Sequence, residues 1–85
     1  MFSVEFSSSA AKFLKKTDKQ LVKRLIEKIE KLETDPFPSD VKRIVNQKEK
    51  IFRVRVGDYR IQYSVYFEKN MVFISDIDRR ERAYD

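Results

Sequence analysis

The residues best suited to chemistry in this chain are arginines that flank a Gly-Asp pair. Arg53 and Arg55 precede Gly57-Asp58, and Arg60 follows it. Runs of alternating apolar and polar residues lie on both sides of the pair, a pattern typical of a β-hairpin with a two-residue loop. Because side chains alternate between the faces of a strand, we expect the arginines to share one face and the apolar side chains the other.

Counting outward from the loop places Arg55 directly opposite Arg60. Like charges at about 5 Å repel by roughly 1 kcal/mol at the dielectric constant of water and roughly 3 kcal/mol at an effective value of 20. Ions and side-chain rotation reduce this cost, and a merely solvated basic face is the simple alternative. The opposed pair nevertheless favours a face that binds an anion, and phosphate fits the guanidinium group best.

The composition of the chain also favours an anionic partner. The chain carries 19 Lys and Arg against 14 Asp and Glu, a formal net charge of +5, which favours a polyanionic partner such as nucleic acid. There is no Cys and no His, which excludes disulfides, thiolate or imidazole metal sites, and Ser/His or Cys/His nucleophile pairs. The composition leaves a carboxylate-only Mg²⁺ site open, but the acidic residues are scattered along the sequence, so we expect no metal and no cofactor.

The length of 85 residues predicts a single domain over residues 1–85. No apolar run approaches the roughly 20 residues that a membrane span requires. The N-terminus lacks a basic segment followed by a hydrophobic stretch, so no signal peptide is expected. These patterns predict a cytoplasmic protein that makes no membrane contact.

The periodicities predict an α+β fold in which a small antiparallel β-sheet of about four strands carries two N-terminal helices on one face. Ser7 to Ser9 are expected to cap the first helix, and Thr17 or Asp18 the second. The first helix is expected to contain residues 10–14, and the second to carry the apolar residues from Leu21 to Leu32 and to end at Asp35-Pro36. The candidate strands are at 2–6, 41–45, 50–56, 59–67 and 71–77.

Two segments of this sequence resemble the RelE toxin family, within the RelE/ParE superfamily of toxin–antitoxin systems. The first is Phe52–Val65, which includes Gly57-Asp58-Tyr59-Arg60, and the second is Arg79-Arg80-Glu81-Arg82-Ala83-Tyr84. The order and length of the helical half also fit, so the resemblance covers nearly the whole chain. It implies a RelE-like fold and a toxin of a type II toxin–antitoxin system.

The resemblance further implies a ribosome-dependent mRNA endoribonuclease. Such a toxin enters the ribosomal A site, cuts mRNA by attack of the 2′-hydroxyl, and thereby inhibits translation. A RelB-like antitoxin, the ribosome and mRNA are the implied partners, without a small-molecule cofactor. Two alternatives stay open: a ParE-like inhibitor of DNA gyrase, and a catalytically degenerate toxin homologue that only binds RNA.

By the same resemblance, Arg60 and Arg80 correspond to arginines that stabilise charge at the scissile phosphate, and Tyr84 to a tyrosine that stacks on a base or transfers a proton. Arg53 and Arg55 stand where the best-known members carry lysines. The candidate catalytic residues are therefore Arg60, Arg80 and Tyr84, and the candidate RNA- and phosphate-binding residues are Arg53, Arg55, Arg82 and Lys50. A structural alternative for the C-terminal segment is a mixed surface charge cluster, in which its arginines face Asp76, Asp78 and Glu81.

Overall fold

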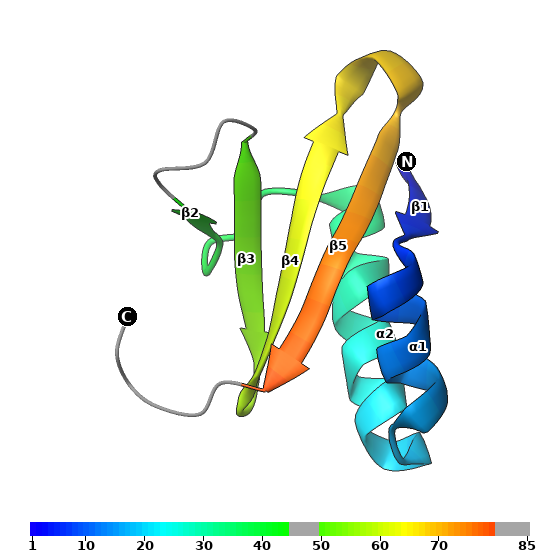
Figure 1. Ribbon diagram of the computed structural model, residues 1–85. Helices are drawn as coiled ribbons and strands as arrows, with labels where there is room; N and C mark the ends of the chain where they lie inside the picture. Colours follow the sequence, from blue (N-terminus) through cyan, green and yellow to red (C-terminus); the bar gives the residue numbers. More distant parts are fainter. Residues whose placement is uncertain (45–49, 80–85) are drawn as a thin grey trace.

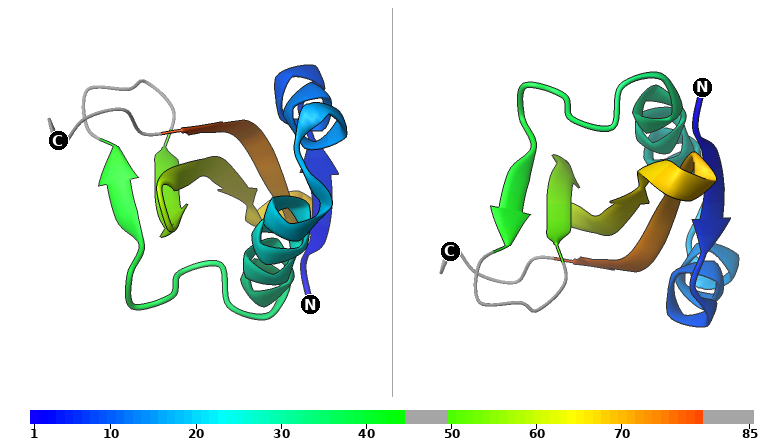
Figure 2. Two further views of the ribbon diagram at one scale, coloured as in Figure 1. Left: turned by 90° about the horizontal axis from the view of Figure 1, so that it is seen from below. Right: turned by 90° about the horizontal axis from the view of Figure 1, so that it is seen from above.

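Two helices cover one face of a curved sheet in this computed structural model, which describes residues 1–44 and 50–79 (Figures 1 and 2). The elements in chain order are β1 (Ser3–Phe6), α1 (Ser8–Lys16), α2 (Lys19–Thr34), β2 (Lys42–Ile44), β3 (Ile51–Val56), β4 (Tyr59–Tyr66), the short 3-10 helix η1 (Phe67–Lys69) and β5 (Met71–Arg79). Within the described residues, no helix is long and apolar enough to cross a membrane.

The sheet has five strands in the order β1-β5-β4-β3-β2. Strand β1 runs parallel to β5, and the other neighbouring strands are antiparallel. The predicted α+β class and the two N-terminal helices are confirmed. The sheet is mixed because α1 and α2 lie between β1 and the meander, and such a long connection allows the first strand to pair in parallel with the last.

Both helices begin at capping side chains that the sequence predicted. The Ser7 side chain accepts a hydrogen bond from the Ala10 amide, and the Asp18 side chain accepts one from the Leu21 amide. Each cap satisfies an amide that has no partner within its own helix. Helix α2 ends at Thr34, two residues before Pro36, as expected from the restriction that proline imposes on the preceding residue.

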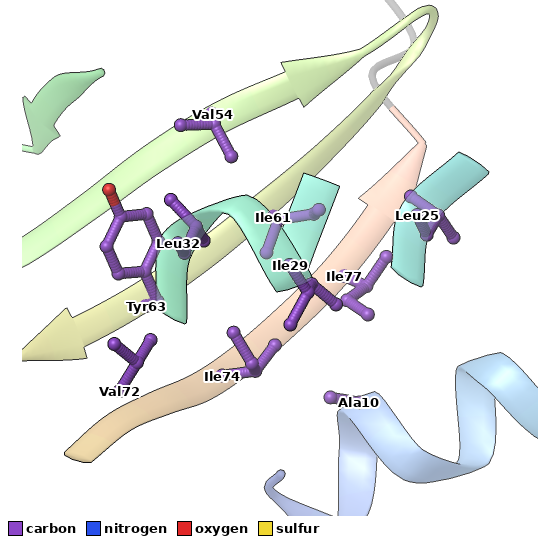
Figure 3. Packing of buried hydrophobic residues seen from close by; sticks show 10 residues of the cluster. All are labelled: Ala10, Leu25, Ile29, Leu32, Val54, Ile61, Tyr63, Val72, Ile74 and Ile77. Atoms are coloured by element: carbon purple, nitrogen blue, oxygen red, sulfur yellow. The ribbon is translucent and has the colours of Figure 1, made fainter. Parts of the chain in front are cut away.

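The core lies between the helices and one face of the sheet (Figure 3). Helix α2 places Leu25, Ile29 and Leu32 against this face, and α1 contributes Ala10. The buried residues from the sheet are Val54, Ile61, Tyr63, Val72, Ile74 and Ile77. Burying this apolar surface is the main favourable term for the fold, since the chain has no disulfide.

Tyr63 attaches the segment after α2 to the core. Its side chain is 0% exposed, and its hydroxyl donates a hydrogen bond of 2.6 Å to the Pro36 carbonyl. Burial raises the pKa of this phenol well above its ordinary value, so the group stays protonated and keeps donating. Tyr63 is therefore a structural residue, as its place among the apolar residues of the hairpin predicted.

A β-bulge at Ser75 interrupts the pairing of β4 with β5. Gln62 lies opposite Asp76, whereas Tyr63 lies opposite Ile74, so Ser75 is an extra residue on β5. An extra residue reverses the alternation of side chains beyond it. As a result, Ile77 is buried with Ile74 in the core.

The bulge is held by the start of α1. The Ser7 hydroxyl donates to the Ser75 carbonyl at 2.8 Å while it accepts the Ala10 amide at 3.1 Å. The Ser7 amide also donates to the Ile74 carbonyl at 2.9 Å. On the other side, the Ser75 hydroxyl donates to the Gln62 carbonyl at 3.2 Å. One serine thus caps a helix and satisfies the irregular backbone of β5.

We expect Ser7→Ala to lower the free energy of unfolding by about 1–2 kcal/mol, because it removes the helix cap and the donor to the bulge. Ser8→Ala, at the exposed neighbouring position, is the matched control and should change stability by less than about 0.5 kcal/mol. Urea denaturation of both variants measures the difference. Equal stability of the two variants would contradict the role assigned to Ser7.

A second prediction concerns the ion pair between α2 and the loop before β2. Lys28 Nζ donates to Asp40 Oδ2 at 2.9 Å, and this hydrogen bond lowers the pKa of Asp40 below its ordinary value of 3.8. Because the folded-state pKa is the lower one, the stabilisation is present above pH 3.8 and is lost as the pH falls through the folded-state value. The Asp40 side chain is 49% exposed, so solvent screening limits the contribution to about 0.2–1 kcal/mol.

Asp40→Asn should therefore cost about 0.2–1 kcal/mol at pH 7 and nothing at pH values well below 3.8. Denaturation curves recorded across this pH range provide the measurement. In a Lys28→Met background the same substitution should cost less at pH 7, because only the weaker contributions of the backbone hydrogen bond and of Lys31 remain. An undiminished cost in that background would show that Asp40 does not act through Lys28.

Candidate nucleic-acid interface

The hairpin of β3 and β4 has the register that the sequence predicted. Phe52 pairs with Tyr63, Val54 with Ile61, and Arg55 with Arg60. Gly57 begins the turn at φ +59°, a backbone conformation that other residues adopt only with strain. The two-residue loop therefore sets which side chains of both strands face the helices and which face the other way.

The three arginines lie on the face of the sheet opposite the helices. Arg53 and Arg55 alternate along β3 with the buried Val54, and Arg60 alternates along β4 with the buried Ile61. Lys42 of β2 lies opposite Arg53 and adds a fourth cation. The side chains of Arg55 and Lys42 are exposed, and those of Arg53 and Arg60 are partly exposed. This group, called the basic face below, comprises Lys42, Arg53, Arg55 and Arg60.

A hollow of about 280 Å³ lies at the edge of β3 where β2 begins. Its lining residues are Asp40, Lys42, Arg53, Val54 and Arg55. Three cations around a hollow are suited to an anionic group, and guanidinium groups bind phosphate in a planar, two-point manner.

Arg60 is held by a carboxylate on the neighbouring strand. Its Nε and Nη2 atoms donate to Oδ1 and Oδ2 of Asp78, both at 3.2 Å. The Arg60 side chain is 24% exposed and that of Asp78 is 40% exposed. An ion pair of this exposure contributes about 0–1 kcal/mol to stability. Its more important effect is geometric, because two parallel hydrogen bonds fix the plane of the guanidinium group.

The charge on this face of the sheet therefore changes from positive on β2, β3 and β4 to negative on β5. One row runs from Arg55 through Arg60 to Asp78, and the next runs from Arg53 through Gln62 to Asp76. The carboxylate of Asp78 offsets the repulsion between Arg55 and Arg60 that the sequence indicated. A polyanion on this face is attracted to β2 and β3 and repelled by the acidic side chains of β5.

Lys50 does not lie with the basic face. It precedes β3 and lines another hollow with Ser64, Val65 and Tyr66. Lys50 is three positions from Arg53 and five from Arg55, about 10 Å and about 16 Å at the usual rise of a strand. The remaining candidates, Arg80, Arg82 and Tyr84, lie outside the described residues.

Among residues 1–44 and 50–79, no three acidic residues gather closely enough to hold a metal ion. The whole chain lacks His and Cys. The chemistry open to the basic face is therefore electrostatic: binding phosphate groups and stabilising negative charge that develops on them.

Sequence reasoning missed the role of Asp78 because it treated the acidic residues of β5 as a loose surface cluster. A signal was present in the spacing of the apolar residues. Val72 and Ile74 are two positions apart, but the next buried residue is Ile77, three positions further. This change of spacing marks the bulge, and with it the face on which Asp78 lies.

A family model described as "ParE toxin of type II toxin-antitoxin system, parDE" matches residues 4–84. A curated protein of Methanocaldococcus jannaschii, described as "Putative toxin RelE1", is 38% identical over 86 aligned residues, which cover 98% of this chain and 94% of that protein.

Solved structures share the fold. A structure of the archaeal RelE–RelB complex from Pyrococcus horikoshii OT3 contains a chain that is 29% identical, with a TM-score of 0.82 and coverage of 96% of this chain and 98% of that one. The isolated E. coli RelE toxin has a TM-score of 0.83 at 21% identity, with 99% and 89% coverage, and supports the fold alone.

The match to nearly the whole length, the identity to the archaeal relative and the shared fold lead to one conclusion. This chain belongs to the ParE toxin family of type II toxin–antitoxin systems and is a RelE-like toxin.

Proposed function

We propose that this protein is a ribosome-dependent endoribonuclease that cuts mRNA in the ribosomal A site. The observation that carries the proposal is the basic face, on which Arg53, Arg55 and Arg60 lie together and Arg60 is oriented by a carboxylate. A binding site for nucleic acid needs only positive charge. A fixed guanidinium group among other cations is the arrangement that also stabilises a charged transition state.

In the proposed reaction, the 2′-oxygen forms a bond to phosphorus and the bond from phosphorus to the 5′-oxygen breaks. The 2′-hydroxyl loses its proton and the leaving 5′-oxygen gains one, so the overall charge is unchanged. Negative charge accumulates on the phosphoryl oxygens in between. Arg60 and Arg80 stabilise that charge, and Arg53 and Arg55 bind the adjacent backbone phosphates.

The remaining candidates complete the proposed site. Tyr84 stacks on a base of the codon or transfers a proton, and Arg82 and Lys50 bind RNA phosphates further along the strand. These assignments are supported by the resemblance of the C-terminal segment to RelE toxins. Action on ribosomes would place the protein in the cytoplasm.

We also propose a RelB-like antitoxin as a protein partner. The support comes from the archaeal RelE of 29% identity, whose structure is a complex with RelB. A net charge of +5 favours a partner with acidic segments, and charge complementarity would speed their association.

Inhibition of DNA gyrase is the second candidate function, and the ParE toxin family model favours it. A toxin of this kind would need the fold but not a charge-stabilising site. The orientation of Arg60 by Asp78 has no evident use in such a role, which is why the endoribonuclease is preferred. A degenerate toxin that binds RNA without cutting it is the third reading.

The direct test is in vitro translation of a defined mRNA, with cut sites mapped by primer extension in the presence and absence of ribosomes. We expect cuts within the A-site codon only when ribosomes are present. Arg60→Ala and Arg80→Ala should each lower the cleavage rate about 100-fold or more, because each removes a group that stabilises the transition-state charge. Lys23→Ala, an exposed cation on α2, is the matched control.

Full cleavage by both arginine variants would contradict the assigned roles. No cleavage by the wild-type protein, together with inhibition of gyrase supercoiling, would establish the second candidate instead. Binding of RNA with neither activity would establish the degenerate toxin.

A further prediction concerns the salt dependence of RNA binding. The logarithm of the affinity for a single-stranded RNA oligonucleotide should fall linearly with the logarithm of salt concentration, by about 0.7 for each phosphate contacted. Arg53→Gln should lower that slope by about 0.7 and weaken binding about fivefold. Lys23→Gln should change neither quantity. An unchanged slope for Arg53→Gln would remove β3 from the RNA-binding surface.

A further inference from the structure

We propose that Asp78 is a positioning residue that holds the Arg60 guanidinium group in the orientation needed to meet a phosphate. This inference rests on the proposed function, since it concerns the same site. Asp78 does not touch the substrate in this account. It acts through the two hydrogen bonds of 3.2 Å that it accepts from Arg60.

The geometry of the pair supports an orienting role. The carboxylate contacts Nε and Nη2, which lie along one edge of the guanidinium group. Two contacts along one edge define the plane of the group and the direction of its other edge, whereas a single contact would leave it free to turn. Two of the five N–H donors of an arginine are used in this way.

The surroundings explain why Arg60 needs such a partner. Arg55 lies directly opposite it on β3, and the repulsion between the two cations pushes the Arg60 side chain towards β5. Asp78 lies opposite Arg60 on that side and attracts it. The row from Arg55 through Arg60 to Asp78 therefore sets the position of the middle side chain from both sides.

Stability alone is a poor explanation for the pair. Both side chains are partly exposed to solvent, which screens their attraction. Asp78 reaches this face only because the bulge at Ser75 reverses the alternation of β5, at the expense of regular pairing. The bulge itself is explained by the burial of Ile77, but the ion pair that it allows on the other face adds little stability, which fits a site residue better than a stabilising contact.

Asp76 offers a matched control on the same strand and the same face. It lies opposite Gln62 instead of an arginine, and it accepts a hydrogen bond of 3.1 Å from the Ser9 hydroxyl. Asp76→Asn and Asp78→Asn each remove one negative charge from this face. Any general increase in attraction for RNA is therefore common to both variants. They differ in the contact that changes, which is the one with Ser9 for Asp76→Asn and the one with Arg60 for Asp78→Asn.

The first experiment measures single-turnover cleavage of mRNA on ribosomes at varied ribosome concentration. Asp78→Asn and Asp78→Ala should each lower the rate at saturation about 10- to 100-fold without raising the half-saturating concentration, because Arg60 is misoriented but the cations remain. Asp78→Glu, which keeps the carboxylate, should retain more activity than Asp78→Ala. Asp76→Asn should cleave at the wild-type rate.

In an Arg60→Ala background, Asp78→Ala should cause no further loss, since its only route to the reaction is then absent. Three results would overturn the proposal: wild-type rates for Asp78→Asn, a full additional loss in the Arg60→Ala background, or faster cleavage by Asp78→Asn. The last would show that the carboxylate competes with phosphate for Arg60.

The second experiment needs no ribosome and separates this inference from the proposed function. The Nε–H group of Arg60 can be followed by NMR of the isotope-labelled protein, through its hydrogen exchange and order. We expect a restrained, protected Nε–H in the wild-type protein and in Asp76→Asn, and a mobile one in Asp78→Asn. Equal mobility in all three would refute the positioning role. If the wild-type protein cuts no mRNA, the proposed function fails and this measurement alone decides whether Asp78 orients Arg60.

Discussion

The extra residue at Ser75 is the constraint on which the arrangement of this sheet depends. Without it, the alternation of β5 would turn Ile77 away from the core and Asp78 away from Arg60. The bulge persists because its backbone is satisfied from two sides, by the Ser7 hydroxyl and through the Ser75 contact with Gln62. Since Ser7 also caps α1, the start of the first helix and the end of β5 that carries Asp78 form one connected structure.

The consequence is a face whose charge is divided between strands. Cations gather on β2, β3 and β4, and the acidic side chains of Asp76 and Asp78 stand on β5. A polyanion on this face would be drawn to the half formed by β2 and β3. At Arg60, the carboxylate of Asp78 also fixes the direction of a charged group. This combination is expected of a site that stabilises charge at a chosen phosphate, and a uniformly basic patch would lack it.

Short sequence patterns predicted the features that neighbouring residues determine, namely the register of the hairpin and the helix caps. A two-residue loop at Gly57-Asp58 leaves a single register for the hairpin, so the shared face of the arginines followed directly. Helix caps were predictable for the same reason. The parallel pairing of β1 with β5 was not predictable, because the residue pattern of a strand does not determine which other strand it pairs with. The Arg60–Asp78 pair required the register of β5, which changes at Ser75 and was visible only as a shift in apolar spacing.

A structure of the Arg60→Ala variant on a translating ribosome, determined by electron cryomicroscopy, would show which surface of the protein meets the mRNA. We predict that the sheet faces the A-site mRNA and that RNA phosphates lie over Lys42, Arg53 and Arg55, away from the acidic side chains of β5. Phosphates lying over α1 and α2, or a protein that does not occupy the A site at all, would contradict it.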